Sequence, residues 1–195
     1  MKFLIFGTCS GTEPMPGRHH VSFAAEHNGG LYWFDAGETC SRTAHMMGVD
    51  LMRIRKIVIS HTHDDHIGGL FNLIFTIRKL DGMYHTLRCR DIELLIPDLR
   101  VWRGLLAAYR CAEGHFTRFC DTDLPDGRGM TTELLYDGGG FRIHAREYGD
   151  GLLCSDGGLR VSALHNGHLR HVPGQPWRSF GFLLEAEGKR TVYSG

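Results

Sequence analysis

Four potential metal ligands lie close together in one short segment. They belong to the run His61-Thr62-His63-Asp64-Asp65-His66. Residues two apart in an extended chain project to the same side, so His61 and His63 could hold one ion. Where the chain turns toward a helix, Asp65 and His66 could face a second ion. Imidazole and carboxylate together suit zinc first, and also manganese or iron, better than a thiolate site or a calcium site would.

Neighbouring residues could support these ligands. Asp64 could hold a ligand imidazole in one tautomer, and Gly68 and Gly69 could let the backbone pass close to the ions. The plain alternative is a histidine-rich solvated loop. Such a loop would need neither the apolar stretch before the run nor the glycines after it, so the pattern favours a metal site.

The run is predicted to join a strand to a helix. Short apolar runs bounded by glycine or polar turns predict strands at residues 2–6, 30–34, 54–60 and 92–96. Helical spacing of apolar residues predicts helices at residues 39–47, 67–80 and 99–112. Strands follow from residue 131, with hairpin turns expected at residues 137–140, 149–151 and 156–158. Residues 113–130 are expected to be a loop. This alternation predicts an α/β fold in which helices cover a sheet.

Composition sets limits on the class of protein. The chain has 195 residues, 42% of them hydrophobic, which suits one domain spanning residues 1–195. Lys plus Arg and Asp plus Glu both number 22, so no overall field attracts nucleic acid or an acidic membrane. The six cysteines form no C-x-x-C pair, which argues against a zinc ribbon. The sequence shows no signal peptide and no apolar run of membrane-spanning length, so no membrane association and a cytoplasmic location are expected.

Several segments resemble the metallo-β-lactamase superfamily, and within it the ribonuclease Z branch. The run from His61 to His66 matches the H-x-H-x-D-H signature of the superfamily. The other matching segments are Gly7-Thr8-Cys9-Ser10-Gly11-Thr12, Phe34-Asp35-Ala36-Gly37-Glu38, Ile57-Val58-Ile59-Ser60, Val161-Ser162-Ala163-Leu164-His165-Asn166-Gly167-His168, Ser179-Phe180-Gly181-Phe182 and Thr191-Val192-Tyr193-Ser194-Gly195. The resemblance implies an αββα sandwich of the metallo-β-lactamase type.

The resemblance also implies roles for individual residues. Asp35 would be a buried structural aspartate that braces the metal loops, and His168 would be a further metal ligand, with His165 and His171 as alternatives. Asp65 would orient or deprotonate a hydroxide that bridges two divalent metal ions and attacks the substrate. In the family an aspartate follows the Ser-Gly pair at once and another histidine ligand comes later. The last strands of the second half are therefore expected to be missing from these residues.

The predicted function is metal-dependent hydrolysis of a phosphodiester by a ribonuclease Z-like enzyme. Ribonuclease Z proteins that mature transfer RNA usually carry a protruding arm, whereas residues 182–191 read as a bare hairpin here. A cyclic or small phosphodiester, as a small molecule or short nucleotide, is therefore favoured over transfer RNA. The sequence does not decide whether the protein binds long nucleic acid or forms a homodimer. The alternatives are hydrolysis of a carbonyl ester, lactone or thioester, a non-catalytic carrier or scaffold, and a di-iron redox protein. The sequence names no substrate-binding residue.

Overall fold

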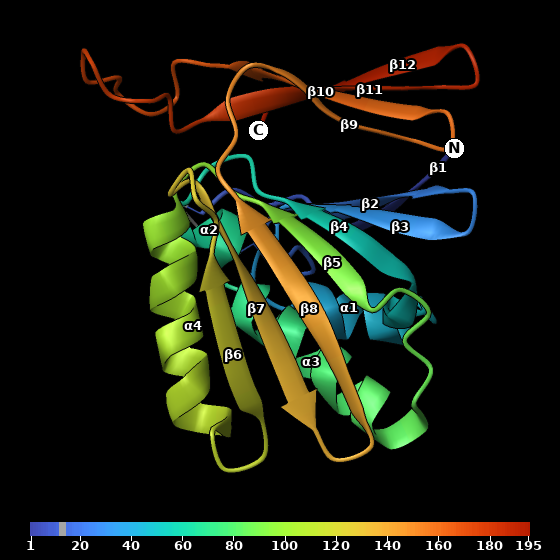
Figure 1. The fold of residues 1–195 in the computed structure, drawn as a ribbon. Coiled ribbons are helices and arrows are strands. Elements are labelled where there is room, and N and C mark those ends of the chain that lie inside the picture. Colours follow the sequence, from blue (N-terminus) through green and yellow to red (C-terminus); the bar gives the residue numbers. More distant parts are fainter. Residues whose placement is uncertain (12–14) are drawn as a thin grey trace.

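Two β-sheets pack face to face, and helices cover the outer face of the larger sheet (Figure 1). The computed structural model describes residues 1–11 and 15–195. Thr12, which ends the first of the segments that resemble ribonuclease Z, lies outside the described residues. Within the described residues the larger sheet has eight strands and the smaller sheet has four.

The larger sheet has a parallel centre and antiparallel edges. In spatial order its strands are β1 (Lys2–Gly7), β2 (Ser22–His27), β3 (Gly30–Phe34), β4 (Ile54–Val58), β5 (Asp91–Leu95), β8 (Gly139–Arg146), β7 (Gly129–Tyr136) and β6 (Arg118–Asp123). The pairs from β3 through β4 and β5 to β8 are parallel, and the others are antiparallel. Parallel neighbours end at the same edge of a sheet, so the loops that follow β3, β4 and β5 meet there.

The smaller sheet is an antiparallel meander. Its strands are β12 (Lys189–Tyr193), β11 (Phe180–Ala186), β10 (Leu159–His165) and β9 (Gly151–Asp156), in that spatial order. The helices are α1 (Cys40–Met46), the one-turn 3₁₀ helix η1 (Leu51–Arg53), α2 (Asp64–Ile67), α3 (Leu70–Tyr84) and α4 (Leu99–Glu113). None of the helices in residues 1–11 and 15–195 is long and apolar enough to cross a membrane.

Strand β3 shows why the larger sheet is covered on both faces. Leu31 and Trp33 pack in the core with the helices, whereas Tyr32 and Phe34 pack in the core with the smaller sheet. Successive side chains of a strand point to opposite faces, so one strand serves both cores. Each large apolar side chain buried in this way contributes roughly 1.5–3 kcal/mol to stability. Asp35 follows directly after this doubly buried strand and is therefore held in place by it.

The predicted α/β alternation and the strand-rich second half are confirmed. The described residues form the helix, sheet and sheet layers of the expected sandwich. Within that part of the chain no helix lies over the outer face of the smaller sheet, where Leu164 and Val192 are exposed (Figure 1).

Several predicted boundaries were wrong. Residues 113–130, expected to be a loop, contain β6, because Arg118–Asp123 pairs with β7 at the edge of the larger sheet. Strand β2 was not predicted. The turn at residues 149–151 joins β8 to β9, which lie in different sheets, so it is a crossover and not a hairpin.

The predicted helix at residues 67–80 is divided. The short helix α2 ends at Ile67, and α3 starts at Leu70 after Gly68 and Gly69. Gly69 packs closely against the loop that follows β3: an added Cβ would lie 2.2 Å from the Gly37 carbonyl oxygen. The glycine therefore lets α3 start against the loop that follows β3.

Candidate metal centre

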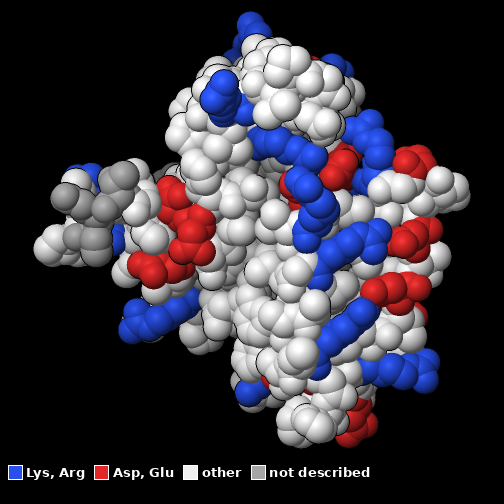
Figure 2. Space-filling view, turned by 90° about the vertical axis from the view of Figure 1, so that its left-hand side faces the viewer, with Lys and Arg blue, Asp and Glu red and all other residues white. Residues whose placement is uncertain are grey.

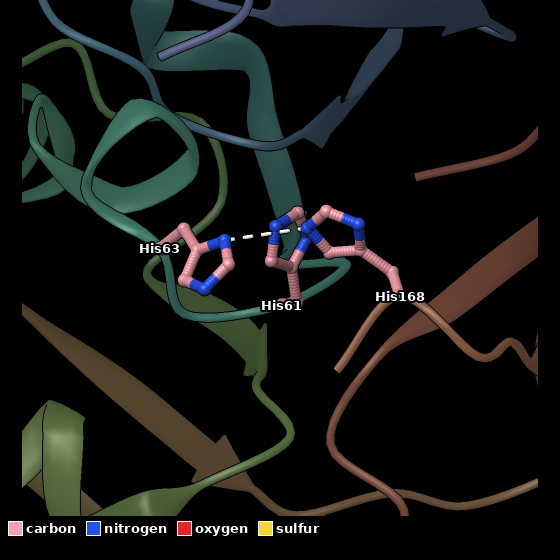
Figure 3. Close-up of side chains that lie close together, drawn as sticks. All are labelled: His61, His63 and His168. Atoms are coloured by element: carbon pink, nitrogen blue, oxygen red, sulfur yellow. Dashed lines mark hydrogen bonds between the residues drawn. The ribbon is translucent and has the colours of Figure 1, made fainter. Parts of the chain in front are cut away.

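Three histidine side chains converge where the loop after β4 meets the loop after β10. His61, His63 and His168 each offer a ring nitrogen, and these atoms all lie within 4.8 Å of one another (Figure 3). His63 Nδ1 and His168 Nε2 are 3.3 Å apart. The rings of His61 and His168 have centroids 4.6 Å apart, at an interplanar angle of 70°. Residues 105 positions apart in the chain thus bring nitrogen donors to one point.

The chemistry of His61 fits a metal ion. Its side chain is buried, and its Nε2 atom has no hydrogen-bond partner within the described residues. A buried polar atom without a partner lowers the stability of the folded protein, and a metal ion would supply the missing partner. Burial, reinforced by repulsion from His66, lowers the pKa of His61 from 6.5 to about 4. The imidazole is therefore neutral near pH 7, which is the form that binds metals.

Ser60 fixes the tautomer of His61. The Ser60 hydroxyl donates its single proton to Asp35 Oδ2, at 2.7 Å. Its oxygen, 3.1 Å from His61 Nδ1, is therefore left to accept a hydrogen bond from the N–H at that position. With the proton on Nδ1, the lone pair of His61 lies on Nε2, the atom without a protein partner.

Asp35 binds several residues of the candidate site through its carboxylate. Its Oδ1 accepts a bond from the backbone N–H of Ser60 at 2.7 Å, and its Oδ2 lies 2.8 Å from His66 Nδ1 and 2.5 Å from the Tyr193 hydroxyl. Asp35 is fully buried and has a left-handed backbone (φ 51°), which aspartate adopts more readily than most residues. A carboxylate only accepts, so His66 carries its proton on Nδ1 and keeps the Nε2 lone pair available.

Asp65 and His66 form a second group of donors beside the three histidines. His66 Nε2 lies 3.3 Å from Asp65 Oδ2, and the rings of His61 and His66 have centroids 3.9 Å apart. Both residues line one cavity of about 570 Å³ together with the histidine cluster. The predicted ligands thus lie around one hollow. Its other lining residues are Thr8, Cys9, Ser10, Gly11, Val21, Tyr193 and Gly195.

Glycine is required beside Asp65. A Cβ atom added to Gly11 would lie 2.7 Å from Asp65 Cγ, closer than real contacts allow. The loop after β1 therefore packs its backbone directly against the carboxylate. This close contact limits the positions that the Asp65 side chain can take.

The structure distinguishes His168 from its two alternatives. His168 reaches His61 and His63, whereas His165 and His171 stack on opposite sides of Trp177, with ring centroids 4.1 Å and 4.0 Å from it.

The predicted role of Asp64 gains no such support. Asp64 is exposed at the start of α2, and the ring nitrogens of His61 and His66 are held by Ser60 and Asp35.

Sequence reasoning missed two polar side chains of the site. Ser60 and Tyr193 both bind Asp35, yet their segments were noted only for their resemblance to the family. Burial and the nearby carboxylate raise the pKa of Tyr193 above its ordinary value, so its hydroxyl stays protonated and donates. A tyrosine near the end of a strand more often packs its ring than binds a carboxylate.

Comparison with known proteins identifies the family. A family model described as Anti-Pycsar protein Apyc1 matches residues 1–128. The chain belongs to the Anti-Pycsar Apyc1 family. Residues 1–128 include every predicted site residue except His168. The segments of this Apyc1-family chain that resemble ribonuclease Z agree with a second comparison, because curated relatives of the chain are named ribonuclease Z.

Ribonuclease Z of Methanothermobacter thermautotrophicus is 35% identical over 133 residues, which are 67% of this Apyc1-family chain and 39% of that protein. Ribonuclease Z of Treponema denticola is 38% identical over 73 residues, 37% of this chain and 24% of that protein. The matches therefore span about two fifths of these curated relatives or less. The Apyc1-family chain is thus a ribonuclease Z-like member of the metallo-β-lactamase superfamily.

Solved structures confirm the fold of this Apyc1-family chain. The short form of human tRNase Z (ELAC1) superposes with a TM-score of 0.64 at 23% identity, over 100% of this chain and 68% of that one. The metallo-β-lactamase fold protein YhfI of Bacillus subtilis gives 0.62 at 12% identity, over 99% and 61%. A diphosphatase of the PhnP family gives 0.55 at 14% identity, over 93% and 61%. The fold is that of the metallo-β-lactamases.

Proposed function

We propose that this chain carries the metal site of a hydrolase that acts on phosphodiesters. The observation that carries the proposal is the convergence of His61, His63 and His168 around the buried, partnerless Nε2 atom of His61. Asp65 and His66 lie beside this cluster on the same cavity. Clustered donors with fixed tautomers on a concave surface are typical of catalytic metal sites.

The names of the relatives support phosphorus chemistry. Ribonuclease Z and tRNase Z are named as nucleases, whose substrates are phosphodiesters, and the PhnP-family protein is named a diphosphatase. We extend this chemistry to the present chain because its donors stand in the segment that carries the H-x-H-x-D-H signature. Carbonyl ester, lactone and thioester hydrolysis remain outcomes of the test below.

We assign the donors to two divalent ions, zinc first and manganese or iron as alternatives. His61, His63 and His168 would hold one ion, and Asp65 and His66 would contribute to a second. Bound divalent ions lower the pKa of water and stabilise negative charge on phosphoryl oxygens. Asp65, whose side chain lines the cavity and is 15% exposed, can orient a water molecule or accept its proton at a carboxylate oxygen. Asp35 keeps the proton of His66 on Nδ1.

A small or cyclic phosphodiester, or a short nucleotide, suits the site better than a long nucleic acid. The cavity holds about 570 Å³, within the range of pockets for small ligands. Between β11 and β12 the chain makes a tight hairpin in which Ala186 pairs with Lys189, so no arm extends from it.

The surface over α4 agrees with this choice. Figure 2, which views the side where α4 lies in Figure 1, shows acidic side chains interspersed among the basic ones. The three arginines of α4 each pair with an aspartate: Arg100 with Asp98, Arg103 with Asp123 and Arg110 with Asp121. Paired charges attract a polyanion weakly.

The direct test is hydrolysis of bis-p-nitrophenyl phosphate by the purified 195-residue chain supplied with zinc, manganese or iron. We expect turnover that His61→Ala abolishes and that His45→Ala, at an exposed histidine of α1, leaves unchanged. A lactone and a thioester are assayed in parallel. Turnover of either one without turnover of the phosphodiester would overturn the substrate class.

A further inference from the structure

An indole ring lies between two imidazoles in the segment that carries His168. Trp177 stacks on His165 with ring centroids 4.1 Å apart at 17°, and on His171 with centroids 4.0 Å apart at 21°. We infer that Trp177 is a positioning residue that holds residues 166–179, and with them His168, at the metal site. The inference rests on the proposed metal site.

Residues 166–179 need such a support because they form neither helix nor strand. Half of their side chains are exposed, including Val172 at 58% exposure. A segment with little buried apolar surface and no backbone ladder is held by few interactions, so each of them matters more. His168 itself is exposed, so its position is set by its neighbours in the chain.

Both outer partners of Trp177 are anchored. Asp150 precedes β9 and holds His165 through both carboxylate oxygens. Its Oδ1 accepts a hydrogen bond from the backbone N–H of His165 at 2.6 Å, and its Oδ2 lies 2.6 Å from His165 Nδ1. His171 Nε2 lies 2.9 Å from the carbonyl oxygen of Gln175, to which it must donate because a carbonyl only accepts. The stack therefore joins the end of β10 to two points of the segment, one on each side of its turn at Pro173 and Gly174.

A second set of bonds fixes the base of the segment. Asn166 Oδ1 accepts from the backbone N–H of His168 at 3.1 Å, and Asn166 Nδ2 donates to the Ser194 carbonyl at 2.8 Å. Ser179 Oγ donates to the Asn166 carbonyl at 3.1 Å and accepts from the Leu169 N–H at 3.2 Å. These bonds orient the backbone on both sides of His168, and the Trp177 stack holds the remainder of the segment over that base.

The stack leaves no open indole face for a substrate base. Both faces of Trp177 are covered by imidazoles, and base-stacking sites present a free aromatic face. Trp177 also packs at the margin of the core between the sheets. If Trp177 only supported the core, its substitution would lower stability alone. If Trp177 positions His168, its substitution weakens metal binding as well.

The experiment compares the unaltered chain with Trp177→Ala and Trp177→Phe. Val172→Ala, in the same segment but outside the stack, is the matched control. Zinc affinity is measured by competition with a chromophoric chelator, and the visible absorption of bound cobalt(II) reports the ligand set. We expect Trp177→Ala to weaken zinc binding by about 10- to 100-fold, which is the usual loss when a residue that orients a metal ligand is removed. Trp177→Phe keeps an aromatic ring and is expected to restore most of the affinity.

The outcomes separate this inference from the proposed function. If the unaltered chain binds neither zinc nor cobalt(II), the metal site itself is wrong. If it binds them and Trp177→Ala binds equally tightly with an unchanged cobalt spectrum, the positioning role is wrong. Thermal unfolding without metal shows whether Trp177→Ala is folded. If it is not, His171→Ala takes its place, with a few-fold loss of affinity expected and an unchanged affinity counting against the role.

Discussion

His61, in the loop after β4, is 2% exposed, whereas His168, which faces it across the cluster, is exposed in a segment without regular structure. The buried side of the site is continuous with the core: Asp35 and Ser60 follow strands β3 and β4 and hold the imidazoles of His66 and His61 by hydrogen bonds. The exposed side depends on a few hydrogen bonds and one aromatic stack. Substitutions on the buried side should therefore reduce stability and metal binding together, whereas loss of the exposed His168 side chain should reduce metal binding alone.

The largest effect is expected from Asp35→Ala on the buried side. It removes the acceptor of bonds from Ser60, His66 and Tyr193, and each buried donor left without a partner costs about 1–3 kcal/mol. We expect the free energy of unfolding of the metal-free protein to fall by about 3 kcal/mol or more, as measured by urea denaturation. Asp64→Ala, at an exposed aspartate, is the control and should change it by less than about 0.5 kcal/mol. Equal stability of the two variants would refute the bracing role of Asp35.

His168→Ala tests the exposed side. We expect zinc affinity to fall about 100-fold, or about 2.7 kcal/mol, because one of three converging nitrogens is lost. The metal-free protein should keep its free energy of unfolding within about 0.5 kcal/mol, because the side chain is exposed. A loss of stability as large as that of Asp35→Ala would remove the contrast between the two sides.

Gly11→Ala tests the contact between the loop after β1 and Asp65. The added Cβ would displace the Asp65 carboxylate, so we expect the second ion to bind about tenfold more weakly, or about 1.4 kcal/mol. The titration with zinc should show this loss while the first ion binds as before. Gly104→Ala in α4, where a Cβ meets nothing within 4 Å, should leave both steps unchanged. A Gly11→Ala variant with normal binding of both ions would show that Asp65 is not a ligand.

Tyr193→Phe should have the smallest effect. It removes one of the hydrogen bonds to Asp35 and leaves the others in place, so unfolding should become about 1 kcal/mol easier. Tyr84→Phe, at a tyrosine that is 60% exposed, is the control and should leave stability unchanged. If the two variants unfold alike, the Tyr193 hydroxyl does not stabilise the buried side.

The contrast also explains how much of the site could be predicted. The candidate ligands from His61 to His66 are local in the sequence, so their spacing between a strand and a helix was enough to propose them, and the structure places them around one cavity. His168 was named from the family resemblance and not from spacing, because nothing local distinguishes it from His165 and His171. The difference lies in the neighbours: those two histidines stack on Trp177, a contact that no periodicity encodes.

Long-range pairing limited the prediction of the fold in the same way. The glycines at residues 149–151 indicate that the chain turns, but not that β8 and β9 belong to different sheets. Strand β6 was missed because Arg118–Asp123 is a polar edge strand, largely exposed and without the apolar alternation of a half-buried strand. The bond from Tyr193 to Asp35 spans 158 positions and could not be read from either segment.

Metal content per chain is the measurement that tests the central claim most directly. The protein is purified without added chelator and its metals are counted by mass spectrometry, together with those of His61→Ala and of the exposed control His45→Ala. We expect at least one zinc, manganese or iron ion per chain in the unaltered protein and in His45→Ala, and a clear loss in His61→Ala. Less than one such ion per chain in the unaltered protein, or undiminished metal in His61→Ala, would contradict the account.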